Sequence, residues 1–142
     1  MTFDPGNTTG FIEYSNITHV AEIDCFYKYD GIYKKLNSVI DEERLVIIEN
    51  VHGILKTREQ IQMSKKVGFI EGVCEYLNIS YILQVPQVRK GYLELAKKIL
   101  KKNVNRFERH NVDAFAHMLR YLDKNHFLKE FLSNVKFQEV IK

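Results

Sequence analysis

Cysteine is scarce in this chain of 142 residues, and its two cysteines, Cys25 and Cys74, stand far apart. Their separation fits neither a paired metal-ligand spacing nor a redox motif. We therefore expect both to be buried, reduced thiols, which suits a protein of the cytoplasm. No uninterrupted apolar run reaches the length of a membrane span, and the first residues lack the apolar core of a signal peptide. Membrane and secretory classes are thus not expected.

Internal repeats, linkers and low-complexity tracts are also missing. The composition, 45% hydrophobic and 27% charged, is that of a globular protein, and the length is enough to bury a proper core. We expect one domain that spans residues 1–142.

The net charge of +3 conceals a strong asymmetry along the chain. Residues 1–50 hold 4 Lys/Arg and 9 Asp/Glu, a net charge of −5, whereas residues 89–142 hold 13 and 6, a net charge of +7. Carboxylates bind cations, and lysine and arginine bind the phosphate backbone of nucleic acids. A metal-dependent nuclease needs both, although a mixed solvated surface gives the same balance.

Apolar periodicity indicates an α/β protein. It predicts strands over 1–4, 11–14, 19–26, 45–48 and 79–83. It predicts helices over 29–43, 57–77, 87–102, 110–122 and 127–132. This order favours a five-stranded mixed sheet flanked by helices, with three strands in an antiparallel meander and two parallel strands reached by helical crossovers.

A turn near the start, Asp4-Pro5-Gly6, places a carboxylate at the end of the first strand. Gly6 and Gly10 have no side chain, so we expect the backbone of a bulky ligand to approach them. Taken alone, Asp4 is equally well explained as an ordinary turn residue.

Three further residues complete a constellation with Asp4. Glu49 ends the apolar strand 45–48, so both carboxylates emerge at one sheet edge if the two strands are parallel neighbours. His110 and Asp113 share one helix face. Together the four groups can hold two divalent cations roughly 3.5–4 Å apart, as in-line phosphodiester hydrolysis uses. Their oxygen atoms favour Mg²⁺ or Mn²⁺ over zinc.

Each of these residues could instead have a purely structural role, and this explanation fits some of them better than others. His110 and Asp113 also suit an ordinary helix start. An ionised Glu49 at the end of a buried strand is harder to explain without a partner.

The chain resembles the RuvC-type Holliday-junction resolvases, which have a ribonuclease H-like fold. The resemblance spans residues 1–122 and rests on five segments in order: 4–10, 47–51, 66–72, 86–90 and 110–116. It implies a homodimeric endonuclease that nicks opposed strands of a four-way or otherwise branched DNA, with two Mg²⁺ per site and Mn²⁺ as a substitute. Small size and richness in Lys, Asn, Ile and Tyr suit a bacteriophage version, in the cytoplasm of a bacterium or a phage-infected cell.

By this match, Asp4 is the carboxylate that bridges the cations, Glu49 is a second ligand, and Asp113 is the ligand on the helix. The family carries either Asp or His at the position of His110. His110 therefore either binds a cation or orients the attacking water. We interpret His117, one turn further, as a structural or solvent-facing residue, because the metal site is filled without it.

The resemblance also implies contacts with DNA. Arg89 and Lys90 fall where the family carries basic residues near the scissile phosphate. His52 replaces an aromatic residue that stacks on an unpaired base, and histidine can also stack. Lys97 and Lys98 form either a DNA contact or a plain solvated face.

The two-fold symmetry of a junction calls for two identical sites on one dimer. The helix 57–77 is the candidate interface, because its apolar positions spread wider than one core stripe. Gly68 and Gly72 on this helix either let a second subunit approach or let the helix pack tightly on its own sheet.

Two other functions stay open. The same fold serves nucleases that act on structured RNA in ribosomal-RNA maturation, and a third possibility is a module that binds junctions without cutting them. The basic C-terminal part favours DNA over RNA. The presence of Asp4, Glu49 and Asp113 together argues against a binding module.

Overall fold

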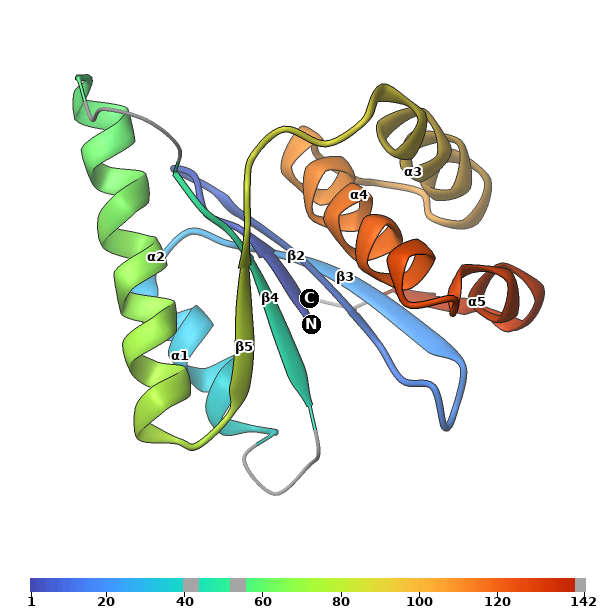
Figure 1. Cartoon of the computed structure of the whole chain (residues 1–142), viewed down its shortest axis with the longest axis horizontal. Helices are drawn as coiled ribbons and strands as arrows, with labels where there is room; N and C mark the ends of the chain where they lie inside the picture. The colour runs from blue at the N-terminus through green and yellow to red at the C-terminus, as the bar shows by residue number, and fades with distance from the viewer. Residues whose placement is uncertain (40–43, 52–55, 140–142) are drawn as a thin grey trace.

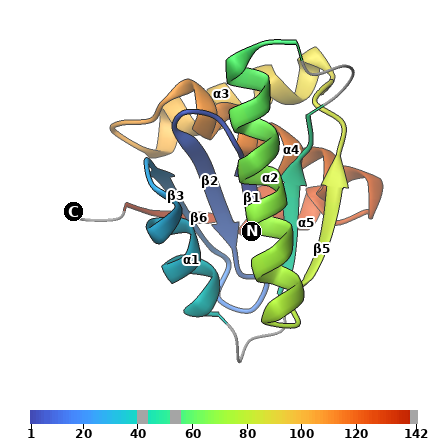
Figure 2. The ribbon, with the colours of Figure 1, turned by 90° about the vertical axis from the view of Figure 1, so that its left-hand side faces the viewer.

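The computed structural model describes residues 1–39, 44–51 and 56–139. A mixed sheet lies between two layers of helices, with α1 and α2 on one face and α3, α4 and α5 on the other (Figures 1 and 2). Its strands are β1 Thr2–Asp4, β2 Thr9–Tyr14, β3 Val20–Phe26, β4 Leu45–Glu49, β5 Ser80–Gln84 and β6 Lys136–Glu139. Its helices are α1 Tyr29–Asn37, α2 Arg58–Tyr76, α3 Lys90–Asn103, α4 Arg109–Lys124 and α5 Leu128–Asn134.

The sheet has the order β5-β4-β1-β2-β3-β6. β1, β2 and β3 form the predicted antiparallel meander, and β4 and β5 run parallel to β1 on its other side. In the register of β1 with β4, Phe3 pairs with Ile48. The α/β class and the ribonuclease H-like arrangement are therefore confirmed. The carboxyl ends of β5, β4 and β1 lie next to one another at one edge of the sheet.

The predicted number of five strands is wrong, because the described residues form six. β6 runs parallel to β3, and Ala21 pairs with Phe137 in the register. The strand was missed because it is four residues long and holds one strongly apolar side chain, that of Phe137. The Phe137 ring packs against Phe115, with ring centroids 5.8 Å apart. Tertiary packing, rather than a local pattern, creates this strand.

Helix boundaries deviate from the periodicity in two places. α1 ends at Asn37 rather than at residue 43, and the Ser38 hydroxyl donates to the Lys35 carbonyl 2.6 Å away. α3 begins at Lys90 rather than at residue 87. The start of α2 agrees with the sequence, because Thr57 caps it by accepting a hydrogen bond from the Gln60 amide at 3.1 Å.

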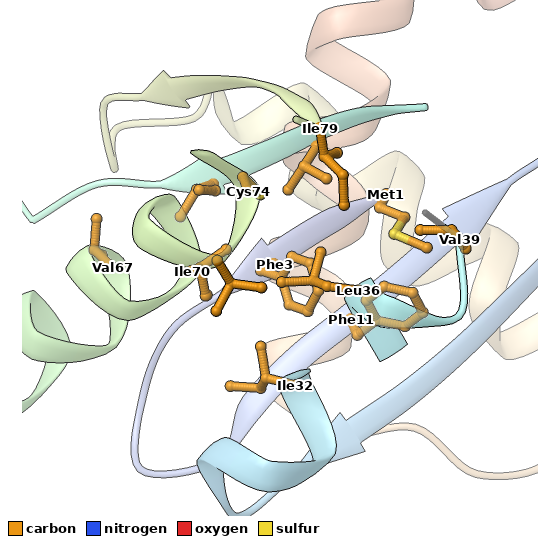
Figure 3. Packing of buried hydrophobic residues seen from close by; sticks show 13 residues of the cluster. Met1, Phe3, Phe11, Ile32, Leu36, Val39, Val67, Ile70, Cys74 and Ile79 are labelled. Carbon is orange, nitrogen blue, oxygen red and sulfur yellow. The ribbon is translucent and has the colours of Figure 1, made fainter. Parts of the chain in front are cut away.

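Each face of the sheet has its own hydrophobic core. Neighbouring residues of β2 point to opposite faces, so Phe11 packs toward α1 and α2 and Ile12 packs toward α4. Figure 3 shows the first core, where Phe3 and Phe11 lie near Leu36 and Ile70. Burying one such side chain stabilises the fold by about 1.5–3 kcal/mol. Both faces of the central strands are thus covered by helices.

The two cysteines fit the expectation in part. Neither forms a disulfide; Cys74 is buried, and burial raises the pKa of its thiol to about 11. Cys25 is only half-buried, and its thiol donates to the Asn111 side chain 3.3 Å away. Within the described part of the chain, no helix has the length and apolarity that crossing a membrane requires.

The start of α4 is seated directly on β2. A Cβ atom added at Gly10 would lie 2.1 Å from the His110 carbonyl oxygen, so only glycine permits this approach. Asn111 secures the contact: its buried side chain donates to the Asp24 carbonyl at 2.8 Å and accepts from the Glu108 amide at 2.9 Å. The expectation that a ligand's backbone approaches Gly10 is wrong, because the backbone of α4 occupies that place.

We expect Gly10→Ala to destabilise the protein by about 3 kcal/mol, because α4 must move off the sheet. The matched control is Gly91→Ala, whose added Cβ meets nothing within 4 Å. That change should alter stability by less than about 1 kcal/mol, in the stabilising direction, because alanine favours helix. Urea denaturation followed by circular dichroism measures both. Equal and small effects would show that the approach of α4 is not tight.

Candidate metal centre

Polar side chains end three adjacent parallel strands. Asp4 ends β1, Glu49 ends β4 and Gln84 ends β5, and Glu49 pairs with Gln84 in the register of the two strands. Asp4 is nearly buried, at 4% exposure. Because β1 and β4 are parallel neighbours, Asp4 and Glu49 emerge at the same edge, as the sequence predicted.

A second row of side chains faces this edge from α4. His110, Asp113 and His117 are spaced so that they share one face of the helix. His110 Nδ1 lies 2.9 Å from Asp4 Oδ2. At the other end of the row, His117 Nδ1 lies 2.8 Å from Gln84 Oε1. The site is therefore two facing rows, one of strand ends and one on a helix.

Three of the four residues expected to bind metal form a close group in the fold. Asp4, His110 and Asp113 each offer a ligand atom within 4.8 Å of the other two. Glu49 is not part of this group of three, but its carboxyl lies close enough to that of Asp4 for each to shift the pKa of the other. Asp4 and Asp113 lie far apart in the sequence, so the fold alone creates this grouping.

Burial and crowding raise the pKa of all three carboxyls. Desolvation is the largest cause for Asp4, whose pKa rises from 3.8 to about 7, and the neighbouring Glu49 adds to the rise. Desolvation also raises the pKa of Glu49 and of Asp113, and the charge of Asp113 raises that of Glu49 further. Without a cation, Asp4 therefore keeps its proton to a higher pH than an exposed carboxyl would.

The two histidines of the α4 row titrate in opposite directions. The hydrogen bond to Asp4 raises the pKa of His110, because the imidazolium form gains an ion pair. Burial lowers the pKa of His117 from 6.5 to about 4, so this ring is neutral at physiological pH.

These residues fit a divalent cation. Three carboxyls with raised pKa values carry a repulsion that a cation removes on binding. Carboxylate oxygens with an imidazole nitrogen form a donor set that suits Mg²⁺ or Mn²⁺. Asp4, Glu49, His110 and Asp113 are the residues that would hold such ions.

A buried lysine of α2 holds the turn between β1 and β2. The ammonium group of Lys66 donates to the carbonyl of Gly6 and, at 2.9 Å, to that of Asn7. Gly6 itself lies against the His110 ring, since an added Cβ would come within 2.9 Å of His110 Cε1. The approach expected at Gly6 is thus made by His110 rather than by a ligand.

Arg89 and Lys90 make no described contact with the carboxyl and imidazole groups of the site. Arg89 lines a separate cavity of about 370 Å³ together with Arg120 and Lys124. Lys90 is exposed and pairs with Glu94, with 3.7 Å between the charged atoms. Among the described residues, neither Arg89 nor Lys90 perturbs the pKa values of the four site groups.

Three more residues were expected to contact DNA: Lys97, Lys98 and His52. Lys97 and Lys98 are exposed on α3, which packs against α4. His52 lies outside the described residues.

Sequence reasoning missed two members of the site. His117 is only 1% exposed, and its Nε2 atom lies 3.7 Å from Glu49 Oε1, so the solvent-facing alternative is wrong. The sequence did indicate that His117 shares a helix face with His110 and Asp113, because it follows them by seven and four residues. No sequence pattern indicated Gln84, because its place at the site depends on the pairing of β5 with β4.

The fold is that of the RuvC-type resolvases, which confirms the resemblance at the level of structure. The structure of Thermus thermophilus RuvC in complex with a Holliday junction substrate is similar, with a TM-score of 0.60 and 12% identity over 89% of this chain and 94% of that chain. A second T. thermophilus RuvC structure has a TM-score of 0.58 and 12% identity, over 95% and 96% of the two chains. The sequence matches no family model and no curated protein.

We expect the metal-free protein to lose stability as the pH rises from about 6.5 to 8. A carboxyl with a raised pKa keeps its proton in the folded state at pH values where the unfolded state has lost it, so stability falls with pH until the folded state releases the proton too. For Asp4, with a pKa of about 7, the loss is about 1 kcal/mol, or roughly 3–6 °C in Tm. The raised pKa of His110 acts in the same direction. Thermal melts in EDTA measure the slope.

The pH window separates this effect from that of His117. The lowered pKa of His117 costs stability only as the pH falls from about 6.5 toward 4, so it contributes nothing above that range. Asp4→Asn should flatten the slope, whereas Asp30→Asn, at an exposed ion pair with Lys34, should leave it unchanged. A wild-type Tm that is constant or rises over the window would contradict the assignment.

Proposed function

We propose that this chain, as one nuclease domain of residues 1–142, is a metal-dependent endodeoxyribonuclease that resolves Holliday junctions or other branched DNA by paired nicks. The observation that carries the proposal is the grouping of Asp4, His110 and Asp113, with Glu49 ending the strand beside Asp4, at one sheet edge of a RuvC-like fold. A fold of this kind with a junction substrate is known from T. thermophilus RuvC. The expected location in the bacterial cytoplasm stays a prediction.

The chemistry follows from the charges of the site. Two bound Mg²⁺ ions, or Mn²⁺ in their place, supply Lewis-acid activation of water and of the scissile phosphate. Asp4 interacts electrostatically with both Glu49 and Asp113, which supports a central role for its carboxylate among the residues that would hold the ions. His110 holds a proton at Nδ1 toward Asp4, which leaves its other nitrogen to orient water.

Basic residues on α3 and α4 support a nucleic-acid substrate. α3 packs on α4, the helix that carries His110 and Asp113, and Lys97 and Lys98 are exposed on it. Arg89 lies at the start of α3, in a cavity shared with Arg120 and Lys124. Backbone phosphates bind such arrays of cations, with an affinity that falls with salt. We assign this surface to the arms of a branched DNA and Arg89 to a phosphate of the cut strand.

The outer face of α2 supports a homodimer. Its inner face packs Val67 and Ile70 against the sheet, whereas Cβ atoms at Gly68 and Gly72 would meet nothing within 4 Å. The alternative in which these glycines pack α2 tightly on its own sheet is therefore wrong. Ile61 and Tyr76, 43% and 82% exposed, extend the same outer stripe. We propose that a second copy packs there and that two sites then cut opposed strands.

We expect Asp4→Asn to lower the nicking rate on a four-way junction on the order of a thousandfold, because the central ligand is lost. Binding of the junction should be retained or improved, because a negative charge near the phosphate is removed. Single-turnover nicking and gel-shift titration with Mg²⁺ or Ca²⁺ measure the two quantities. Asp30→Asn, a surface carboxylate paired with Lys34, is the matched control and should cut at the wild-type rate.

The substrate panel distinguishes the alternatives. Four-way, Y-shaped and linear DNA duplexes and a structured RNA are compared at equal concentration. Preference for the RNA would overturn the proposal in favour of a ribonuclease. Tight junction binding without cutting, in either metal, would indicate a binding module. An Asp4→Asn protein that cuts at the wild-type rate would remove Asp4 from the centre.

We expect Gly72→Arg to give monomers that lose paired nicking, because a long charged side chain then projects into the proposed interface. The matched control is Gly91→Arg, another helical glycine whose Cβ would meet nothing within 4 Å. Analytical ultracentrifugation gives the oligomeric state, and a cruciform plasmid separates paired from single nicks. Full resolution by a wild-type protein that sediments as a monomer would contradict the dimer.

A further inference from the structure

His117 is a polar side chain in a place that a hydrophobic residue could fill. It is 1% exposed and belongs to the stretch of α4 that packs against the sheet, between the buried residues Ala116 and Met118. A buried imidazole loses its hydration, which costs free energy unless its nitrogens find partners. The described contacts of this ring are with Gln84 and with Glu49. Both belong to the row of strand ends at the metal centre.

The contact with Gln84 fixes which nitrogen carries the proton. Nδ1 lies 2.8 Å from Gln84 Oε1, an atom that only accepts, so Nδ1 donates and the lone pair of the neutral ring is on Nε2. Nε2 faces Glu49 Oε1 at 3.7 Å, which is beyond hydrogen-bonding distance. The two atoms therefore face each other without a hydrogen bond between them. A cation bound between them would contact both.

The spacing fits this role. Metal bonds to histidine nitrogen and carboxylate oxygen are about 2.0–2.2 Å long, so two neighbouring ligands of one ion lie roughly 3–4 Å apart. The separation of 3.7 Å between His117 Nε2 and Glu49 Oε1 lies in this range. Histidines that bind metals almost always donate their other N–H to an oxygen that orients the ring, which is what His117 does with Gln84.

We propose that His117 is a further ligand of the metal centre, on the Glu49 side, and that Gln84 is the positioning residue that aims its Nε2 atom. The inference rests on the proposed function only in that both use the same cation site. With His110, the centre then has an imidazole at each end and the three carboxylates between them. Imidazole nitrogens bind transition ions better than they bind Mg²⁺. The centre should therefore prefer Mn²⁺ to Mg²⁺ by more than about tenfold.

Metal titration of the full chain without DNA tests the proposal. We expect His117→Leu to weaken Mn²⁺ binding by about 10–100-fold in calorimetry and to change Mg²⁺ binding much less. Gln84→Leu should weaken Mn²⁺ binding in the same way, while Gln84→Glu, which keeps an acceptor for Nδ1–H, should preserve it. Circular dichroism and Tm confirm that each variant is folded.

A second measurement compares the metal ligands of the wild-type protein and of His117→Leu directly. Pulsed electron paramagnetic resonance of bound Mn²⁺ should show a histidine nitrogen coupling in the wild-type protein that is lost in His117→Leu. The same couplings in both proteins, or unchanged Mn²⁺ affinity in His117→Leu, would overturn the proposal and make His117 a structural residue. Because no DNA is present, a protein that binds Mn²⁺ as expected but cuts no junction would overturn the proposed function alone.

Discussion

The close approach of α4 to β2 is the constraint on which the site depends. The His110 carbonyl lies where any side chain at residue 10 would begin, so glycine there lets the helix backbone touch the strand. Asn111 then ties the first turn of α4 to the carbonyl of Asp24 on β3. His110 and Asp113 consequently reach Asp4 from a rigid helix rather than from a loop. A metal centre needs its ligands held to within a fraction of an ångström, and two regular elements in direct contact provide this.

The same closeness has an electrostatic cost. Asp4, Glu49 and Asp113 are brought together at a partly dry sheet edge, and the pKa of each rises because its charged form is disfavoured there. The surrounding structure compensates through its two hydrophobic cores, one on each side of β1 and β2. The metal-free protein is therefore less stable than a protein of this fold without the cluster would be. A bound cation reverses the sign of this contribution, so stability and metal affinity are linked through the same three groups.

Local patterns were enough to predict the central part of the fold. The unbroken apolar run that became β4 predicted a buried strand, and the crossover helix after it predicted the parallel pairing with β5. That Asp4 and Glu49 share a sheet edge depended on a pairing of β4 with β1, which the structure shows. Residues whose roles come from tertiary contacts were not predictable. β6 depends on the packing of Phe137 against Phe115. The role of Lys66 depends on the hydrogen bond that its ammonium group donates to the Gly6 carbonyl, a contact that no local pattern predicts. For His117, the sequence showed that it shares a helix face with His110 and Asp113. Its buried environment depends on the contact with Gln84, which lies two elements earlier in the chain.

α2 connects the two surfaces on which the proposed activity depends. Lys66 points inward from it and holds the carbonyls of Gly6 and Asn7, which follow Asp4 in the chain. Gly68 and Gly72 lie on the opposite face and leave the helix backbone open. A helix is stiff along its length, and the Thr57 capping box secures the first turn of α2. The surface assigned to the second copy and the turn that carries Asp4 are therefore separated by one helix diameter, about 10 Å. Packing at the proposed interface and the placement of the central carboxylate thus depend on the same rigid element.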